Sequence, residues 1–138
     1  MRTVLILASL LLQASISRSA EPPSPIERYR KLEFLPDEKN FEKGWKDRVT
    51  ADYDVINSAD LKSLRAALKD DNPFVRAIAA YALGVRNDRT SADALAELVK
   101  NDKEYVVRIR SVEALALLKM KPEVIESALK DRDPGDTP

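Results

Sequence analysis

Residues 69–84 read "KDDNPFVRAIAAYALG", and residues 100–117 read "KNDKEYVVRIRSVEALAL". The second stretch repeats the first. At a shift of 31 or 32 residues the following pairs match: Leu64 and Leu95, Lys69 and Lys100, Asp71 and Asp102, Val75 and Val107, Arg76 and Arg108, Ala82 and Ala114, Leu83 and Leu115. The change of shift places a one-residue insertion in the turn, where insertions are tolerated. A third copy begins at Pro122, because "ALKDRDP" at 128–134 repeats "ALKDDNP" at 67–73.

Each copy predicts two helices joined by a turn that carries aspartate. In the first copy, apolar residues at helical spacing line one face of each helix: Leu61, Leu64 and Leu68, then Val75, Ala79, Ala82 and Leu83. Asn72 is a suitable N-cap and Pro73 a suitable first residue for the second helix. In the second copy, Leu95, Leu98 and Val99 lie on the first helix, and Thr90 with Asp93 predicts a capping box before it.

A proline-rich spacer and two helices are predicted before the repeats. Ser24, Pro25 and Glu27 form a capping box that should start a helix over about 25–34. A second helix over about 37–57 carries one apolar stripe: Phe41, Trp45, Val49, Tyr53 and Ile56. A stripe at helical spacing is usually core, so we expect it to dock onto the repeats and cap them. The alternative is an exposed aromatic binding ridge.

The repeated unit resembles the HEAT repeat, because a helix and an Asp-bearing turn precede a helix that opens with Val-Arg and continues to Ala-Leu. The spacing is shorter than the usual 40 or so residues and is similar to that of the compact bacterial repeats first described in phycobilin lyases. The resemblance implies an all-α fold, a short α-solenoid of stacked helical hairpins with the second helices on its concave side. The expected organisation is a spacer at 21–24, N-terminal capping helices at 25–57, about two and a half HEAT-like repeats at 58–131, and a disordered tail at 132–138. The resemblance to the HEAT repeat also implies that Asp71 pairs with Arg76 and Asp102 with Arg108 in a structural polar ladder.

Residues 1–20 read as a signal peptide. Arg2 precedes a nine-residue apolar core, "VLILASLLL" at 4–12, and small residues follow. Cleavage is expected between residues 17 and 20, which would place the mature protein in the periplasm or outside the cell. The alternative is an uncleaved anchor, but nine residues fall short of the roughly 20 that span a bilayer. We therefore expect no membrane span after cleavage.

Composition excludes several functional classes. The chain of 138 residues has 23 basic and 23 acidic residues, so it lacks the basic surplus that binding to nucleic acid uses. It has no cysteine and no histidine, which removes the usual zinc sites, thiol nucleophiles and imidazole bases. No carboxylate lies inside an apolar run, and no phosphate-binding glycine loop is present. We expect no catalytic residues, no metal and no cofactor.

Positions at which the two copies differ are candidates for binding a partner. Ala77, Ile78 and Tyr81 align with Ile109, Arg110 and Glu113, and Phe74, Ile78 and Tyr81 form a second apolar stripe. Either this stripe receives the helix of Trp45, or it is a protein-binding surface with an aromatic anchor. The candidate partner-binding residues are Phe74, Ile78, Tyr81, Ile109, Arg110 and Glu113.

The sequence leads us to expect a non-catalytic interaction module with an unknown protein partner. About three repeats are normally needed for stability, so the side near Val124, Ile125 and Leu129 is expected to be an open apolar edge, available for self-association. One alternative is an accessory or truncated N-terminal domain of a larger envelope protein or enzyme whose catalytic part is absent. The other, by family analogy, is a lyase-like enzyme, which an export signal makes less suitable.

Overall fold

The computed structural model describes residues 21–32 and 41–130 of the chain, and every regular element in these ranges is helical. The α-helices are α2 (Pro25–Arg30), α3 (Phe41–Ser58), α4 (Leu61–Ala67), α5 (Pro73–Val85), α6 (Ala92–Asn101), α7 (Tyr105–Leu118) and α8 (Pro122–Lys130). A short 3₁₀ helix, η1 (Arg89–Ser91), precedes α6. The expected signal peptide and C-terminal tail lie outside the described residues.

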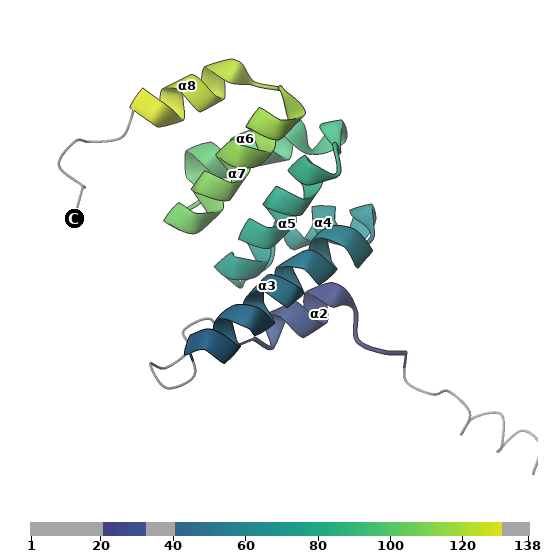
Figure 1. Ribbon diagram of the computed structural model, residues 1–138. Coiled ribbons are helices and arrows are strands. Elements are labelled where there is room, and N and C mark those ends of the chain that lie inside the picture. Colours follow the sequence, from purple (N-terminus) through teal and green to yellow (C-terminus); the bar gives the residue numbers. More distant parts are fainter. Residues whose placement is uncertain (1–20, 33–40, 131–138) are drawn as a thin grey trace, which may run out of the picture.

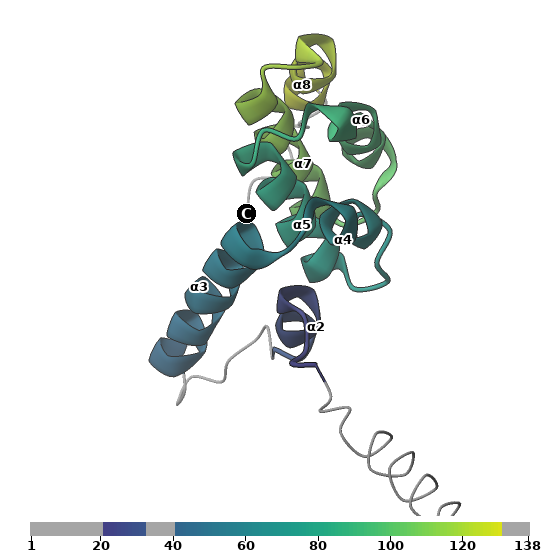
Figure 2. The same cartoon turned by 90° about the vertical axis from the view of Figure 1, so that its right-hand side faces the viewer.

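The helices are arranged in two layers. Helices α3, α5 and α7 lie side by side (Figure 1), with α5 in contact with both α3 and α7. Helices α4 and α6 lie on the other side, where they pack on α5 and α7 respectively (Figure 2). Helix α2 packs on α3 at one end of the stack, and α8 packs on α6 and α7 at the other. This arrangement confirms the prediction of a short helical solenoid.

The core lies between the two layers. Most leucines that the sequence placed on inner faces are buried, with Leu64, Leu83, Leu95 and Leu115 each 0% exposed, whereas Leu61 and Leu98 are partly buried. Helix α5 is buried along most of its length because it is covered by α3, α4 and α7. Its Gly84 has Ala114 of α7 so close that an added Cβ would lie 2.5 Å from the Ala114 Cα. The glycine therefore sets how closely α5 and α7 approach.

Helix starts follow the sequence in most places. The capping box of Ser24 and Glu27 is present, and the Asn72 side chain accepts a hydrogen bond from the N–H of Phe74 at 2.9 Å. The predicted capping box of Thr90 and Asp93 is wrong. Ser91 is the residue before α6 and makes no capping bond, because the Thr90 and Ser91 hydroxyls donate instead to the Asp88 carboxylate.

Helix α3 packs on α5, as expected of a capping helix, but the prediction that its stripe is buried is wrong for Trp45, Val49 and Tyr53. Trp45, Val49 and Tyr53 are 62%, 48% and 70% exposed. Helix α3 packs inward through Val55, which is buried, and through Ala51 and Ile56, which are partly buried. Of these three, only Ile56 belongs to the predicted stripe. Small and β-branched side chains allow α3 to approach its neighbours closely, and the large side chains of Trp45 and Tyr53 point to solvent. The Phe41 side chain lies outside the described residues.

Candidate protein-binding face and polar ladder

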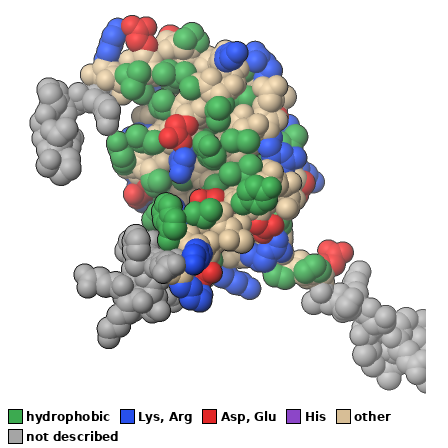
Figure 3. Space-filling model, in the orientation of Figure 1, with side chains coloured by type: hydrophobic (Ala, Val, Ile, Leu, Met, Phe, Trp, Pro, Cys, Tyr) green, Lys and Arg blue, Asp and Glu red, His purple; other side chains and the backbone are tan. Residues whose placement is uncertain are grey.

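The layer of α3, α5 and α7 presents a surface rich in large apolar side chains. Figure 3 views this layer from its solvent side and shows hydrophobic side chains spread over it, with charged groups at both ends of the stack, along one edge and in a red and blue pair near the middle. Trp45, Val49 and Tyr53 are one helical turn apart on α3. At a rise of about 1.5 Å per residue, this stripe is roughly 12 Å long. An exposed aromatic ridge on this helix was the alternative that the sequence left open.

Two arginines of the same layer lie over an aromatic ring of the neighbouring helix. The Arg48 guanidinium of α3 lies 5.3 Å from the ring centroid of Phe74 on α5. On the neighbouring pair of helices, Arg110 of α7 lies 4.8 Å from the ring centroid of Tyr81 on α5. Arg110 also bonds Glu113 at 2.8 Å, and both of these side chains are about 40% exposed. Aromatic and arginine side chains held in place by such contacts are favoured at protein interfaces, because little side-chain freedom is lost on binding.

The candidate residues from the sequence fall into two groups. Tyr81, Arg110 and Glu113 come together in one cluster between α5 and α7. Phe74 and Ile109 are half-buried on the same two helices, whereas Ile78 is only 5% exposed and belongs to the core. Ile78 is buried because neighbouring helices cover α5 on most sides. Its side chain is part of the core and does not reach the surface of the layer. Arg48 was not among the candidates from the sequence. Its contact with Phe74 joins α3 and α5, which the sequence does not show to be neighbours.

The polar ladder exists, but it joins neighbouring units rather than residues of one unit. Arg76 donates from Nε and Nη2 to the carboxylate of Asp102 in the next turn, at 2.8 and 3.0 Å. Its Nη1 donates to the backbone carbonyls of Asp70 and Asp71 in its own turn, at 2.7 and 3.2 Å. Arg108 likewise donates from Nη1 to the carbonyls of Asp102 and Lys103. The predicted pairings of Asp71 with Arg76 and of Asp102 with Arg108 are thus made through backbone carbonyls and not through the aspartate side chains.

The aspartate equivalent to Asp102 is Asp70, not Asp71. The Asp70 carboxylate accepts the N–H of Asn72 at 2.9 Å and a hydrogen bond from Arg30 of α2. The Asp102 carboxylate accepts the N–H of Glu104 at 3.0 Å. The two turns therefore match at a shift of 32 residues, and the insertion lies before the aspartate. Helix α2 supplies the arginine that a preceding repeat would supply.

Burial and hydrogen bonding act in opposite directions on these carboxylates. Burial by itself raises the pKa of Asp102, but the hydrogen bonds from Arg76 and from the Glu104 N–H outweigh it, so the pKa is below its ordinary value. The pKa of Asp70 is lowered in the same way, against burial, by Arg30 and the Asn72 N–H. Hydrogen bonds from Arg65 hold the pKa of the buried Asp88 below its ordinary value despite burial, with help from Ser91 and Thr90. All three are ionised structural groups at neutral pH.

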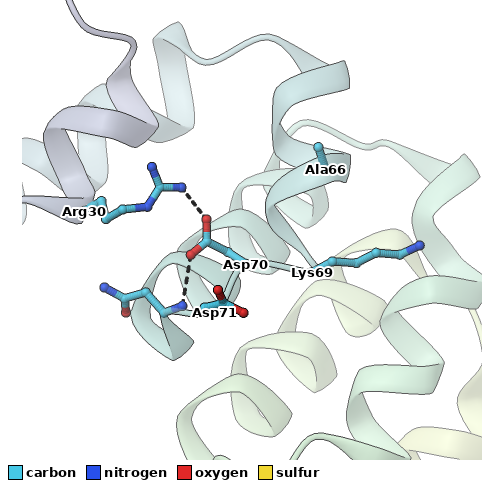
Figure 4. Close-up of a pocket in the computed structure, with 6 residues that line it drawn as sticks. Arg30, Ala66, Lys69, Asp70 and Asp71 are labelled. Atoms are coloured by element: carbon cyan, nitrogen blue, oxygen red, sulfur yellow. Dashed lines mark hydrogen bonds and ion pairs between the residues drawn. The ribbon is translucent and has the colours of Figure 1, made fainter.

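A shallow pocket lies at the first rung of the ladder. Its lining residues are Arg30, Ala66, Lys69, Asp70, Asp71 and Asn72. Figure 4 shows the Arg30 and Asp70 side chains pointing toward each other, while the Lys69 side chain extends away from them. Arg30 and Asp70 are thus paired with each other, and this pair joins α2 to the first turn.

In residues 21–32 and 41–130, no three acidic side chains come together in a group that could hold a metal ion. None of the helices in these ranges combines the length and the apolar character that crossing a membrane requires.

Residues 54–116, which span the end of α3, the helices α4 to α6 and most of α7, match the family described as HEAT repeats. Neither the curated proteins nor the solved structures compared with the chain gave a match.

Proposed function

The chain is a HEAT-repeat protein through residues 54–116, and from this premise we propose that it is an exported, non-catalytic module that binds a partner protein through the layer of α3, α5 and α7. HEAT repeats generally mediate protein interaction and scaffolding, and stacked repeats offer an extended surface for it. We call the surface that includes Trp45, Val49, Tyr53, Tyr81 and Arg110 the binding face.

The observation that supports this proposal most directly is the exposure of the α3 stripe. Helix α3 packs on the repeats through other side chains, and Trp45 and Tyr53 stay more than 60% exposed. Exposed apolar groups that gather on one face mark interaction sites more often than scattered ones do. Tryptophan, tyrosine and arginine are also the side chains that contribute most to binding at protein interfaces.

The charge of the chain favours a protein as the partner. Bases and acids are equal in number, and Arg48 and Arg110 on the binding face are engaged with aromatic rings. A nucleic acid would need several uncommitted cations along one surface. The non-catalytic part of the proposal is supported by the carboxylates of the ladder, which are ionised and bonded to arginine rather than held protonated.

Site-specific cross-linking tests the binding face. A photoreactive amino acid in place of Tyr53 should cross-link a partner in an extract of the cell envelope. The same group in place of Leu129 of α8, which is 59% exposed but lies off the layer, should not. The substitutions Trp45→Ser and Tyr81→Ser should reduce the cross-link at position 53 without changing the helical circular dichroism. Equal cross-linking from positions 53 and 129, or none from either, would refute the proposed face.

Export has its own test. The mass of the protein purified from its native host should show an N-terminus between residues 18 and 21, and the protein should be recovered from the periplasm or the medium. Intact Met1 on a protein that stays in the cytoplasm would contradict export but not the binding face.

A further inference from the structure

The structure shows how one repeat receives the next, because α7 covers one face of α5. Gly84 of α5 lies against Ala114 of α7. Ala80 and Ala77 precede Gly84 by about one and two helical turns, so the three residues share a face. Ala77 and Ala80 are 4% and 0% exposed. The joint between the two units therefore depends on small side chains where the helices approach most closely.

The equivalent face of α7 is open. At the shift of 32 residues, the three small residues of α5 correspond to Ile109, Val112 and Ala116 of α7. Ala116 is exposed, Ile109 and Val112 are half-buried, and Tyr105, about one turn before Ile109, is 58% exposed. In Figure 1, α7 is the last of the three helices that follow one another along the layer, and the contact of α8 with α7 does not bury these side chains. We call the surface of Tyr105, Arg108, Ile109, Val112 and Ala116 the end face.

Arg108 of the end face has two donor atoms that no carboxylate bonds in the part of the chain that the structure describes. Its equivalent, Arg76, donates from Nε and Nη2 to the Asp102 carboxylate at 2.8 and 3.0 Å, which forms the rung between the two units. Arg76 is held for this contact by bonds from Nη1 to the carbonyls of its own turn. Arg108 makes the same bonds from Nη1, to the carbonyls of Asp102 and Lys103 at 2.9 and 3.0 Å. Its guanidinium is therefore held in the orientation in which Arg76 binds a carboxylate.

We propose that the end face binds one helix of a partner protein, and that the turn before this helix carries an aspartate whose carboxylate accepts hydrogen bonds from Nε and Nη2 of Arg108. The partner helix takes on α7 the place that α7 takes on α5. The end face is separate from the binding face, and this proposal does not rest on the proposed function.

The side chains of the end face restrict which helix fits. Ala116 stands where α5 has glycine, so the partner helix should present a small side chain at this point, as α7 presents Ala114 to Gly84. Binding removes the apolar groups of Ile109 and Val112 from water, which favours association. The aspartate fixes the register, because a carboxylate matches the paired donors of a guanidinium.

A second copy of the chain does not supply such a helix. Among the helices whose starts the structure describes, only α5 and α7 have an aspartate two residues before the N-cap, namely Asp70 and Asp102. Both helices are already packed within their own stack. Both carboxylates are also bonded, Asp70 by Arg30 and Asp102 by Arg76. A head-to-tail contact between copies would have to break these bonds, whereas a separate partner helix breaks none of them.

A peptide of residues 100–118 is a defined probe for the end face. It contains Asp102 and all of α7, so it carries the turn and the helix that α7 offers to α5. Added to isotopically labelled protein of residues 21–138, the peptide should shift the amide signals of the end face in a saturable way. The dissociation constant should lie below about 1 mM.

Variants of the peptide and of the protein test the rung. Asp102→Asn in the peptide should weaken binding at least on the order of tenfold, because hydrogen bonds to a charged group are lost. Glu113→Gln in the peptide is the matched control, since it removes the same charge outside the turn and should leave the affinity unchanged. Arg108→Met in the protein should weaken binding of the native peptide by a similar factor, and the Asp102→Asn peptide should then bind no more weakly than the native one. Circular dichroism reports whether Arg108→Met keeps its fold, and if it does not, the peptide variants decide.

Cross-linking shows where the peptide binds. A photoreactive amino acid in place of Tyr105, which is 58% exposed, should cross-link to the peptide. The same group in place of Tyr53 on the binding face should not. Because position 53 is also the one that tests the proposed function, failure of one proposal can be told apart from failure of the other.

Four results would overturn the proposal. The first is no saturable binding at up to about 1 mM peptide. The second is equal affinity of the native and Asp102→Asn peptides. The third is cross-linking of the peptide from position 53 and not from position 105. The fourth is a cross-link from position 105 that forms without peptide, within one chain or between two copies, because the chain itself would then cover the end face.

Discussion

Removing one partner of the Arg76–Asp102 pair should destabilise the protein strongly. The two side chains are only 11% and 6% exposed, and their closest atoms, Nε and Oδ2, are 2.8 Å apart. The substitution Asp102→Ala leaves the Arg76 guanidinium buried without a carboxylate and the N–H of Glu104 without its acceptor. Removing one partner from a buried ion pair costs about 3–5 kcal/mol. At roughly 4 °C or more per kcal/mol, the melting temperature should fall by about 12 °C or more.

Thermal unfolding of residues 21–138, followed by circular dichroism, measures this loss. The double variant Arg76→Met/Asp102→Ala should be more stable than the sum of its single variants predicts, because it leaves no uncompensated buried charge. Asp47→Ala is the matched control. Asp47 pairs with Lys43 on α3, but these side chains are 48% and 76% exposed, so no measurable change is expected. If Asp102→Ala unfolds within two or so degrees of the native chain, the ladder is not an important source of stability.

The same pair predicts how stability depends on pH. The pKa of Asp102 is lower in the folded protein than in the unfolded chain, where it is about 3.9. A lowered carboxyl pKa stabilises the fold fully above the unfolded value, and this contribution is lost as the pH falls through the folded value. The native chain should therefore lose its advantage over Asp102→Asn below about pH 4. A stability difference that stays constant from pH 7 to pH 2 would show that Asp102 does not titrate as the geometry implies.

Three further predictions follow from single residues. Gly84→Ala should lower the free energy of unfolding by about 1–3 kcal/mol, because the Cβ of the new alanine would overlap Ala114. Urea unfolding measures this, and a curve like that of the native chain would contradict the close approach of α5 and α7. The fluorescence of Trp45, the single tryptophan, should resemble that of tryptophan in water and shift to the blue when a partner binds; emission already blue-shifted in the free protein would mean that Trp45 is buried. Asp88→Asn should lower the free energy of unfolding by about 1–3 kcal/mol, because an amide nitrogen would face the donors of Arg65, Thr90 or Ser91. Thermal melts measure this, and an unchanged free energy of unfolding would show that the Asp88 carboxylate does not stabilise the loop.

Local patterns were enough to predict the helices and the core of the repeats. Apolar residues at helical spacing placed Leu64, Val75, Leu83 and Leu115 in the interior, and all four are fully buried. Caps that depend on neighbouring residues, such as Asn72 before Pro73, were also predictable. The same reasoning failed at Thr90, because its hydroxyl had a competing acceptor in Asp88 that only the folded loop brings near.

The orientation of α3 and the direction of the ladder could not be obtained this way. Periodicity shows that Trp45, Val49 and Tyr53 share a face but not whether a neighbour covers that face. Likewise, the resemblance to HEAT repeats implied a pair of Asp71 and Arg76 within one unit, whereas Arg76 reaches the carboxylate of Asp102. Both errors concern contacts between distant parts of the chain, which depend on how closely the helices stack.

The double engagement of Arg76 bears on how the domain unfolds. This one side chain bonds the carbonyls of its own turn and the carboxylate of the next, so neither unit can open without disturbing the other. In a linear array, strong coupling between neighbours relative to the stability of each unit makes unfolding cooperative. The rungs should therefore suppress partly unzipped states, in which one repeat is melted and the rest is intact. For a short solenoid, such states would expose apolar helix faces to proteases and to aggregation.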